Sequence, residues 1–492
     1  MIVGAERRGV MLVAVVLWCT GGCSASLPRV GGELIAPVAP NRQWRPPPDA
    51  QANDSVRVGM REPPLPTRGA ALTLPAIVDL ALRNNPVTRE SWAQAQAYAD
   101  SYGAARASYL PTVDASATVT RSEQPGGSSL APAAGPTVQS TVSPKGSLSY
   151  TLLDFGVRSG NVTSARETAY AVSFTHNATI QSTVLNVEQA YYSYVAARAV
   201  LEAQLVSFRD AEVSYDAARK MDSVGMATKA DVLQAQTALA QAQLGLDTTQ
   251  ALLQTTRTKL AVAFGAPATA QFDVAARAED INVADVTQSV ESLVDEALRR
   301  RPDVQSAQAT VRASQANVRA ARGALLPSFG VSASRGYTNA NVSTLSGNNY
   351  SVALSVQLPL FDGSLRRYDV ARAQANMQYE AAYSEALDQS VAAQVVTSYY
   401  QTQSAAQQVR TTDVLFTSAS ASMDVARARY RAGVGTILDL LTAQATLASA
   451  RAQRARARWT WAQQLAGLAY AVGALNDQGG AGIRTAPPPL HP

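Results

Sequence analysis

An internal duplication constrains this chain more than any other feature, because a sequence written twice predicts two copies of one structural unit. The copies align at a spacing of 216 residues near their starts and 208 residues further along, so they differ by a net eight residues in the connection between them. We therefore expect two repeats, at residues 72–285 and 286–473. Recurring positions include Val78, Asp79, Pro86, Leu110 and Pro111 with Val294, Asp295, Pro302, Leu326 and Pro327, and Val162, Tyr191, Gly225, Asp231 and Leu239 with Val370, Tyr399, Gly433, Asp439 and Leu447.

Each repeat opens with a helix and continues into a strand. The helices are expected at residues 87–107 and 303–324, each after a proline that suits a first helical turn, and Pro111 and Pro327 end them. Apolar and polar residues then alternate with a period of two, which predicts a strand with one apolar face. The apolar positions are Val113, Ala115, Ala117 and Val119 in the first repeat and Phe329, Val331 and Ala333 in the second.

A second alternating segment follows in each repeat, so each repeat supplies one hairpin. We expect the hairpins at about residues 109–155 and 326–361, with loops at 122–144 and 338–349 where Gly, Ser, Pro and Asn are frequent. The apolar positions of the returning strands are Leu148, Tyr150 and Leu152 in the first repeat and Tyr350, Val352, Leu354 and Val356 in the second.

After each hairpin comes a run free of glycine and proline, 64 residues long at 161–224 and 69 residues long at 364–432. At about 1.5 Å per residue these runs predict helices of roughly 95 and 105 Å. Helices of this length belong to coiled coils or to a structure that crosses a wide gap. Each run then turns at a glycine and returns as a second helix, at 228–264 and 436–465, which gives helix pairs over 158–264 and 364–473.

Four strands with an apolar face are too few to close a barrel. In a membrane their open edges would leave unpaired backbone groups in hydrocarbon at several kcal/mol each, so closure requires strands from other chains. Three copies supply twelve strands, a wider barrel than the roughly eight-stranded size that side chains fill. A water-soluble sandwich, which also shows such alternation, is the alternative. Aromatic residues near the strand ends fit a membrane interface: Tyr109, Phe329, Tyr337, Tyr350 and Phe361.

The first 22 residues resemble a bacterial lipoprotein signal, with a basic start, an apolar run and small residues before Cys23. On this interpretation Cys23 receives the lipid and becomes the first mature residue, and Ser24 after it favours the outer membrane. Thr20 departs from the leucine usual at that position, and a plain secretory signal is the alternative. The proline-rich residues 23–71 are expected to form an extended tether, and residues 474–492 a disordered tail.

Charge and residue content argue against several classes of function. The net charge of +5, a charged fraction of 16% and the lack of a basic run with interleaved aromatics argue against nucleic-acid binding. The densest basic cluster, Arg451, Arg454, Arg456 and Arg458, is expected to be a solvated or inter-helix face. With two histidines and no phosphate-binding loop, metal cluster or nucleophile motif, we expect no enzyme, no metal site and no cofactor except the lipid at Cys23. His176, inside a long helix, is expected to be a surface or packing residue.

Two motifs in the second repeat, together with the duplication, resemble TolC-type outer-membrane factors over residues 72–473. The motifs are Leu358-Pro359-Leu360-Phe361-Asp362-Gly363 before a long helix, and Arg429-Tyr430-Arg431-Ala432-Gly433 followed by Asp439-Leu440-Leu441-Thr442-Ala443-Gln444.

That resemblance implies an α+β membrane protein: a homotrimer whose twelve-stranded barrel, with four strands per protomer, lies in the outer membrane and continues into a periplasmic helical tunnel. It also implies a periplasmic adaptor and an inner-membrane transporter as partners, with the channel conducting small molecules passively. A channel for type I protein secretion is the alternative within the family. A periplasmic coiled-coil adaptor, which needs no membrane strands, is the alternative outside it.

The resemblance further implies functional residues at the helix-to-helix turns. Asp439 matches the carboxylate that rings the pore, and Asp231 and Tyr430 match positions of the network that closes it. The arginine partner of that network falls at Gly435, and a second acidic ring position falls at Thr442. The alternative for Asp231 and Asp439 is capping of the helix that follows each turn. Adaptor docking is implied for the turn residues Gly225, Met226, Gly433 and Val434, where glycine is first explained by the backbone of a helix end.

Overall fold

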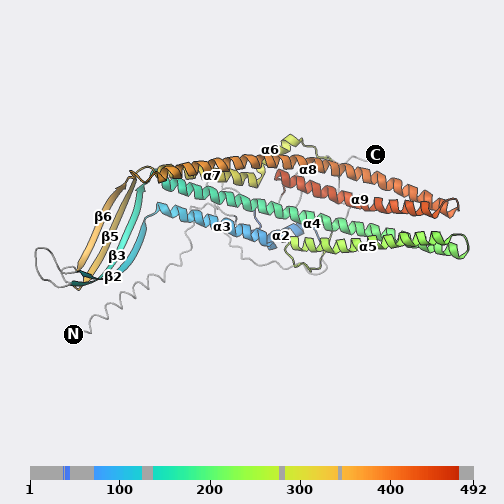
Figure 1. Cartoon of the computed structure of the whole chain (residues 1–492), viewed down its shortest axis with the longest axis horizontal. Helices are drawn as coiled ribbons and strands as arrows, with labels where there is room; N and C mark the ends of the chain where they lie inside the picture. Colours follow the sequence, from blue (N-terminus) through green and yellow to red (C-terminus); the bar gives the residue numbers. More distant parts are fainter. Residues whose placement is uncertain are drawn as a thin grey trace, which may run out of the picture.

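The computed structural model describes residues 37, 39–44, 71–124, 137–275, 283–341 and 346–475. Figure 1 shows an elongated protomer with a four-stranded sheet at one end and long helices that run away from it. The expected signal at residues 1–22 and the lipidation site Cys23 lie outside the described residues. Within the described ranges, no helix combines the length and the apolar character needed to cross a membrane.

The sheet confirms the two expected hairpins and places them side by side. Its strands are antiparallel and lie in the order β2-β3-β5-β6, so β3 of the first repeat pairs with β5 of the second. This leaves β2 and β6 as the two edges of the sheet. The strand bounds are β2 (Thr112–Gln124), β3 (Thr137–Leu153), β5 (Ser328–Ala340) and β6 (Gly347–Gln357).

Strand pairing sorts the alternating residues onto two faces, as expected. Val113 lies opposite Leu148, and the same row continues through Ala333 to Val352, which defines the apolar face. The neighbouring row, Thr112, Ser149, Ser332 and Ala353, belongs to the polar face. The side chain of Val352 is 73% exposed, so nothing in the protomer covers the apolar face there.

The expected loops are too long at both hairpins. β3 begins at Thr137 and runs through Pro144, inside the segment expected as a loop, and β5 and β6 likewise extend into residues 338–349. Pro144 lies opposite Ala117 in the ladder. The ladder to β5 skips Ser143 and Pro144, whereas the ladder to β2 continues through both residues. Turn-type composition is therefore overridden here by continuous pairing with β2.

The long helix pairs are confirmed. α4 (Val157–Ser223) and α8 (Leu365–Arg431) are unbroken helices of 67 residues each, and α5 (Lys229–Ala263) and α9 (Ile437–Val472) return beside them. The end expected for α9 at residue 465 is wrong, because the helix continues through Gly467 to Val472. Leu468 and Ala469 just beyond this glycine are fully buried, and their burial outweighs the roughly 1 kcal/mol that glycine costs inside a helix.

Left-handed backbone turns each strand into its long helix. Phe155 and Gly156 have φ of 48° and 101°, and Gly363 and Ser364, at the equivalent positions of the second repeat, have φ of 66° and 71°. Each junction therefore holds one glycine and one residue for which this conformation is strained.

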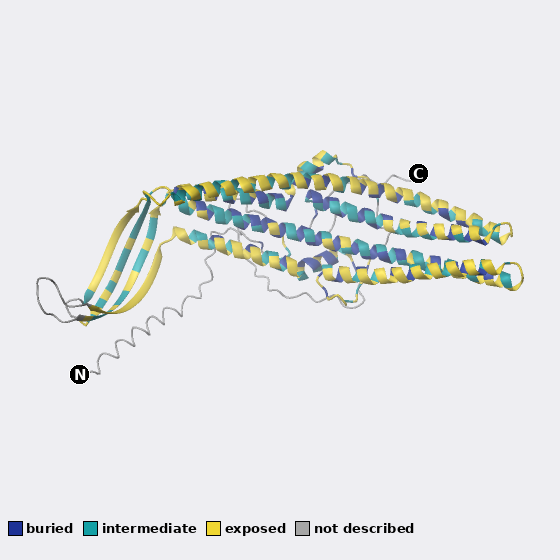
Figure 2. Ribbon diagram, viewed as in Figure 1, coloured by how far each residue is buried: buried dark blue, intermediate teal, exposed yellow. Residues whose placement is uncertain are grey.

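Shorter helices pack beside the long ones. These are α2 (Leu74–Asn84), α3 (Pro86–Arg106), α6 (Val290–Arg300) and α7 (Pro302–Gly323), of which the sequence predicted α3 and α7. The parallel pair β1 (Ala71–Leu72) and β4 (Asp273–Val274) lies beside them. Helices α2 and α6 and the start of α7 contribute to the main core at mid-length, and α3 packs on α4 nearer the sheet. Figure 2 shows buried residues in this middle region and along α4 and α7 toward the sheet, whereas the helix surfaces near the far turns are largely exposed. The mid-length core includes Ile77, Val187, Phe264, Leu293, Val395, Trp459 and Leu468.

Part of the expected tether is docked instead of extended. We call residues 37 and 39–44 the strap. Trp44 of the strap is 4% exposed, with its ring centroid 5.2 Å from that of Tyr170 and 5.0 Å from that of Phe174. The Asn177 side chain accepts a hydrogen bond from the Trp44 N–H and donates one to the Trp44 carbonyl, both at 2.6 Å. Burial of a large aromatic ring and pairing of its backbone thus fix this segment on α4.

Two further expectations about single residues are settled. His176 is fully buried between the strap and α3, with its Nδ1 2.8 Å from the Ser91 hydroxyl and its Nε2 3.3 Å from the Arg42 carbonyl, so it is a packing residue. The tail expected from residue 474 begins later, because Leu475 is 2% exposed and belongs to the mid-length core. Residues 476–492 lie outside the described part of the chain.

Candidate functional site

The ends of the two helix pairs furthest from the sheet are turns of the same construction. Gly225 and Gly433 have φ of 75° and 73°. The next residue closes each turn: Met226 N–H donates to the Met221 carbonyl at 2.8 Å, and Val434 N–H donates to the Arg429 carbonyl at 3.1 Å. Both glycines are therefore required by a left-handed helix C-terminus, as the sequence indicated.

The residues after these glycines present apolar side chains to solvent. Met226 is 77% exposed and Val434 is 68% exposed. A cluster of exposed apolar residues at the tip of each helix pair is a feature that a partner protein could cover. The adaptor-docking role of Gly225, Met226, Gly433 and Val434 stays a prediction.

The capping alternative for the two aspartates is confirmed. Asp231 accepts a hydrogen bond from the Thr228 N–H at 2.8 Å, while the Asp231 N–H donates to the Thr228 hydroxyl at 3.2 Å. Asp439 and Thr436 form the same reciprocal pair at 3.3 and 3.1 Å. These are capping boxes at the starts of α5 and α9. A capping role does not exclude a role in the pore, because each carboxylate keeps further acceptor positions.

The carboxylate of Asp439 is fixed in its charged form. Hydrogen bonds from the Thr436 hydroxyl and N–H lower the pKa of Asp439 below its usual value, and Arg429 nearby contributes in the same direction. Asp439 is fully exposed. It is thus an accessible negative charge near the far end of the helices.

Tyr430 lies between the two helix pairs. Its hydroxyl donates to the Met221 sulfur at 3.5 Å, across from α8 to α4. Burial raises the pKa of Tyr430, and the nearby Asp231 carboxylate raises it further. The structure therefore brings Tyr430 close to Asp231, while the hydroxyl bonds to methionine; the closing role of these residues stays a prediction.

Gly435 occupies the position at which the resemblance to TolC-type factors implied an arginine. A Cβ built at Gly435 would lie 3.0 Å from the Arg429 Cβ and 3.1 Å from the Tyr430 nitrogen. The chain passes so close to the last turn of α8 that a side chain here would displace its neighbours. Thr442, at the second acidic ring position, is exposed on α9 and contributes a hydroxyl without charge.

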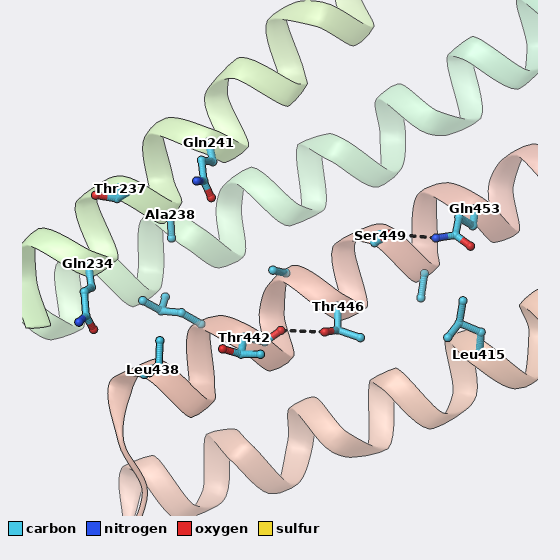
Figure 3. A pocket seen from close by; sticks show the side chains of 13 residues that line it. Gln234, Thr237, Ala238, Gln241, Leu415, Leu438, Thr442, Thr446, Ser449 and Gln453 are labelled. Carbon is cyan, nitrogen blue, oxygen red and sulfur yellow. Dashed lines mark hydrogen bonds between the residues drawn. The ribbon is translucent and has the colours of Figure 1, made fainter.

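A groove of about 700 Å³ runs between α5 and α9 just above the turns. Figure 3 shows its two walls, with Gln234, Thr237 and Gln241 on α5 and Thr442 and Thr446 on α9. These residues recur every three to four positions, so each wall is one stripe of a helix. Uncharged side chains, chiefly Gln, Thr, Ala and Leu, line the groove, which includes Leu415 of α8. Two adjacent helix stripes of this kind leave space in which a third helix can pack.

Sequence reasoning missed the ion pairs that join the two helix pairs. Asp210 of α4 lies 2.9 Å from Arg451 of α9 and 3.9 Å from Arg427 of α8. The sequence predicted either a solvated face or an inter-helix face for the basic cluster on α9. Arg451 shows that the cluster is partly an inter-helix face. Arg454 instead pairs with Asp413 of α8 at 2.6 Å, inside the second helix pair. Asp210 is not part of any sequence motif. Only the packing of α4 against α9 shows that it joins the two helix pairs.

The pattern of two repeats is decisive when the chain is compared with known families. The family described as outer membrane efflux protein matches residues 77–266 and again residues 293–474. The chain belongs to the outer membrane efflux protein family. Each match covers one of the two repeats described above, and the chain is an outer-membrane protein like other members of this family.

Individual relatives and solved structures agree with this assignment. The chain is 29% identical to protein CyaE of Bordetella pertussis, over 91% of this chain and 92% of CyaE. It is 27% identical to the antibiotic efflux pump outer membrane protein ArpC of Pseudomonas putida, over 90% and 91% of the two chains. The crystal structure of the outer membrane protein VceC from Vibrio cholerae superposes with a TM-score of 0.71 at 18% identity, over 81% of this chain and 96% of VceC. The predicted fold class is confirmed by these similarities.

Proposed function

We propose that this protein is the outer-membrane channel of a tripartite efflux system and that it conducts small molecules passively. The observation that carries the proposal is the architecture: an uncovered apolar sheet face at one end and 67-residue helices at the other, in a chain of the outer membrane efflux protein family. The name of ArpC, an antibiotic efflux pump protein, favours small molecules as cargo over secreted proteins.

Assembly into a homotrimer is part of the proposal. The sheet has two open edges, β2 and β6, and an apolar face that the protomer leaves exposed. In hydrocarbon these edges must pair with strands of other copies. Three copies would close a barrel of twelve strands wide enough for a channel, with the polar face of Thr112, Ser149 and Ser332 toward the lumen.

The groove between α5 and α9 is the proposed adaptor site. A partner helix with small apolar residues at helical spacing would lie between the Gln234–Gln241 stripe and the Leu438–Gln453 stripe. The exposed Met226 and Val434 at the turns would extend this surface to the tips. An inner-membrane transporter would bind beyond the adaptor.

The docked strap supports lipidation at Cys23 in the same membrane as the sheet. The Trp92 indole N–H donates to the Pro37 carbonyl at 2.9 Å, and Trp92 lies 14 residues, about 21 Å, before the sheet end of α3. Another 14 residues separate Pro37 from Cys23, a length of chain that spans at most about 50 Å. A lipid at Cys23 can therefore reach the level of the sheet, whereas the turns at the far end of α4 lie about 70 Å beyond Asn177.

Asp439 is the proposed selectivity residue of the pore, with Asp231 and Tyr430 beside it. Three copies of an exposed, ionised carboxylate around a narrow opening would favour cations. Thr442 adds no second ring of charge, so we propose a weaker cation preference than two acidic rings would give.

Export with a partner system tests the proposal directly. We expect cells that carry an adaptor and pump but no channel of their own to stop accumulating a fluorescent pump substrate when this chain is expressed. Ala238→Trp, which fills the groove, should abolish export while trimers persist in the outer membrane. Leu244→Trp, on an exposed position of α5 outside the groove lining, is the control. Full export by the Ala238 variant would refute the groove as the docking site, and no export by the wild type with any adaptor would refute the function.

A further inference from the structure

A single arginine interrupts the apolar face of the central strands. Arg335 lies on β5 in the same alternating row as Phe329, Val331 and Ala333, and it is exposed. Its partners across the ladder are Gly146 on β3 and Tyr350 on β6. Because β5 is an inner strand of the sheet, Arg335 does not lie at an edge that joins another copy.

A charge on this face needs a compensating partner, and the described strands offer none. No ion pair or hydrogen bond of the Arg335 side chain occurs within the described residues. The acidic residue on the same face, Glu123, lies on β2 with β3 between the two strands, and it is opposite Val138. An arginine that faces lipid costs about 2–4 kcal/mol at the middle of a bilayer and about 0–1 kcal/mol near its interfaces. Arg335 must therefore be close to an interface.

The position of Arg335 along β5 selects the outer interface. It is seven residues from Ser328, where the strand leaves the helical part, or roughly 23 Å along the strand and roughly 18 Å in height at a tilt of about 40°. The lipid-facing band of such a barrel is about 25 Å tall, so the side chain can extend to its outer rim. Tyr350 beside it is 84% exposed and Tyr337 is 46% exposed, as expected of an interfacial aromatic belt.

The surroundings leave the guanidinium open on one side. A Cβ at Gly146 would meet only the Arg335 carbonyl, at an ordinary distance of 3.9 Å, so the fold itself does not require glycine there. The absent side chain clears the space next to Arg335, and Tyr350 supplies an aromatic ring and a hydroxyl on the other side. A planar guanidinium in such a gap fits a phosphate group with two parallel hydrogen bonds.

We propose that Arg335, with Gly146 and Tyr350, binds a phosphate group of the phosphorylated glycolipid in the outer leaflet of the outer membrane. The inference rests on the proposed barrel, whose apolar face would contact lipid. The phosphate neutralises the charge that the strands leave unpaired, and each protomer of the assembly carries one such site.

The test uses the purified full-length assembly in detergent and a bis-phosphorylated, acylated glucosamine disaccharide as the probe, with binding measured by native mass spectrometry and by the shift in melting temperature. Arg335→Gln should weaken binding by at least about tenfold, the loss expected for one charge-assisted hydrogen bond. Lys145→Gln is the matched control, because Lys145 precedes Gly146 on the opposite, polar face. Arg335→Lys should retain part of the affinity, and Gly146→Leu should lose it while the arginine remains.

Three results would overturn the proposal. The first is equal binding by wild type and Arg335→Gln, and the second is equal binding of the dephosphorylated glycolipid. The third is equal binding of phosphatidylglycerol, which would assign the site to any phosphate lipid. Unchanged conductance of Arg335→Gln in planar bilayers separates loss of this site from failure of the proposed channel.

Discussion

The carboxylate of Asp210 on α4 lies 2.9 Å from the Arg451 guanidinium on α9, which joins the first helix pair to the second. Next to it, the Ser214 hydroxyl donates to the Gln444 amide oxygen at 3.2 Å, again from α4 to α9. These contacts lie between the turns and the mid-length core. They hold the two helix pairs together at a level where no motif in the sequence marks a connection.

Asp210→Asn should loosen the contact between the two helix pairs and so raise the open fraction of the proposed channel. Both partners are about one quarter exposed, so we expect a modest loss of about 1 kcal/mol, which corresponds to a roughly fivefold increase in the open fraction. Single-channel recording in planar bilayers measures the open fraction. Asp413→Asn, which breaks a pair within the second helix pair, should leave the open fraction nearly unchanged, and equal effects of the two variants would argue against a joining role for Asp210.

Asp439→Asn should reduce cation preference, because it removes one charge per protomer from the proposed ring. Thr436→Ala separates the two roles of Asp439, since it removes the capping hydroxyl and keeps the carboxylate. We expect a lower melting temperature in both variants and a changed reversal potential in Asp439→Asn alone. Hydrogen bonds from Thr436 hold the pKa of Asp439 below its ordinary value, so the wild type should keep the preference on acidification to a lower pH than Thr436→Ala does. Identical reversal potentials in all three proteins would remove the ring hypothesis.

Docking of the strap should weaken in acid. Burial lowers the pKa of His176 from 6.5 to about 4, against a smaller opposing effect of the Arg42 carbonyl. The docked state therefore binds the proton less readily than the free state. Docking is strongest above pH 6.5. Between pH 6.5 and 4 the equilibrium constant for docking falls by up to about tenfold per pH unit. Protease cleavage of residues 39–44 and the fluorescence of Trp44 report docking. His176→Gln should flatten this pH dependence, and a profile like that of the wild type would assign it to another group.

Ser364→Gly should stabilise the protein, because glycine adopts φ of 71° without strain. The relief of about 1–2 kcal/mol exceeds the entropy cost of glycine, about 0.5–1 kcal/mol. Gly363→Ala at the neighbouring φ of 66° should destabilise by a similar amount. Melting temperatures of the assembled protein in detergent measure the stability change of both variants. A lower melting temperature of Ser364→Gly would indicate that the serine side chain stabilises the junction in another way.

The sequence predicted those parts of the fold that depend on local pattern. The repeats, both hairpins, both long helix pairs and the two glycine turns all follow from period, from runs free of glycine and proline, and from the internal duplication. The predicted strand limits were wrong around Pro144, because composition does not report the continuous pairing of this segment with β2. The prediction of an extended tether was wrong at the strap for a similar reason. Trp44 is buried by Tyr170, Phe174 and Asn177, which lie more than 120 residues away in the sequence.

The candidate site was predictable where a motif marks it. Asp231 and Asp439 recur at equivalent positions and follow a glycine turn, so their capping role could be predicted from the chain, whereas their candidacy for the pore came from the family resemblance. Two features could not be predicted from the sequence: the groove between α5 and α9, and the Asp210–Arg451 pair. Both depend on how the two helix pairs lie against each other. Small and polar residues at helical spacing suit many partners, and only the packed structure shows which stripe remains uncovered.

The hydrophobic contacts of the helices divide along their length. Near the turns, one cluster joins α8 to α9 around Met423 and Leu447, and a small one joins α4 to α5 around Ala218 and Ala235, with Leu441 of α9 packed against both. At mid-length a single core holds both helix pairs. Once the contacts near the turns are broken, each pair can pivot about that core as a stiff lever. From Trp459 to Ile437 the arm measures 22 residues, about 33 Å, so a tilt of about 5° at the pivot would displace the tip by roughly 3 Å. A partner that pushes gently on the ends could thus widen the aperture without disturbing the membrane end.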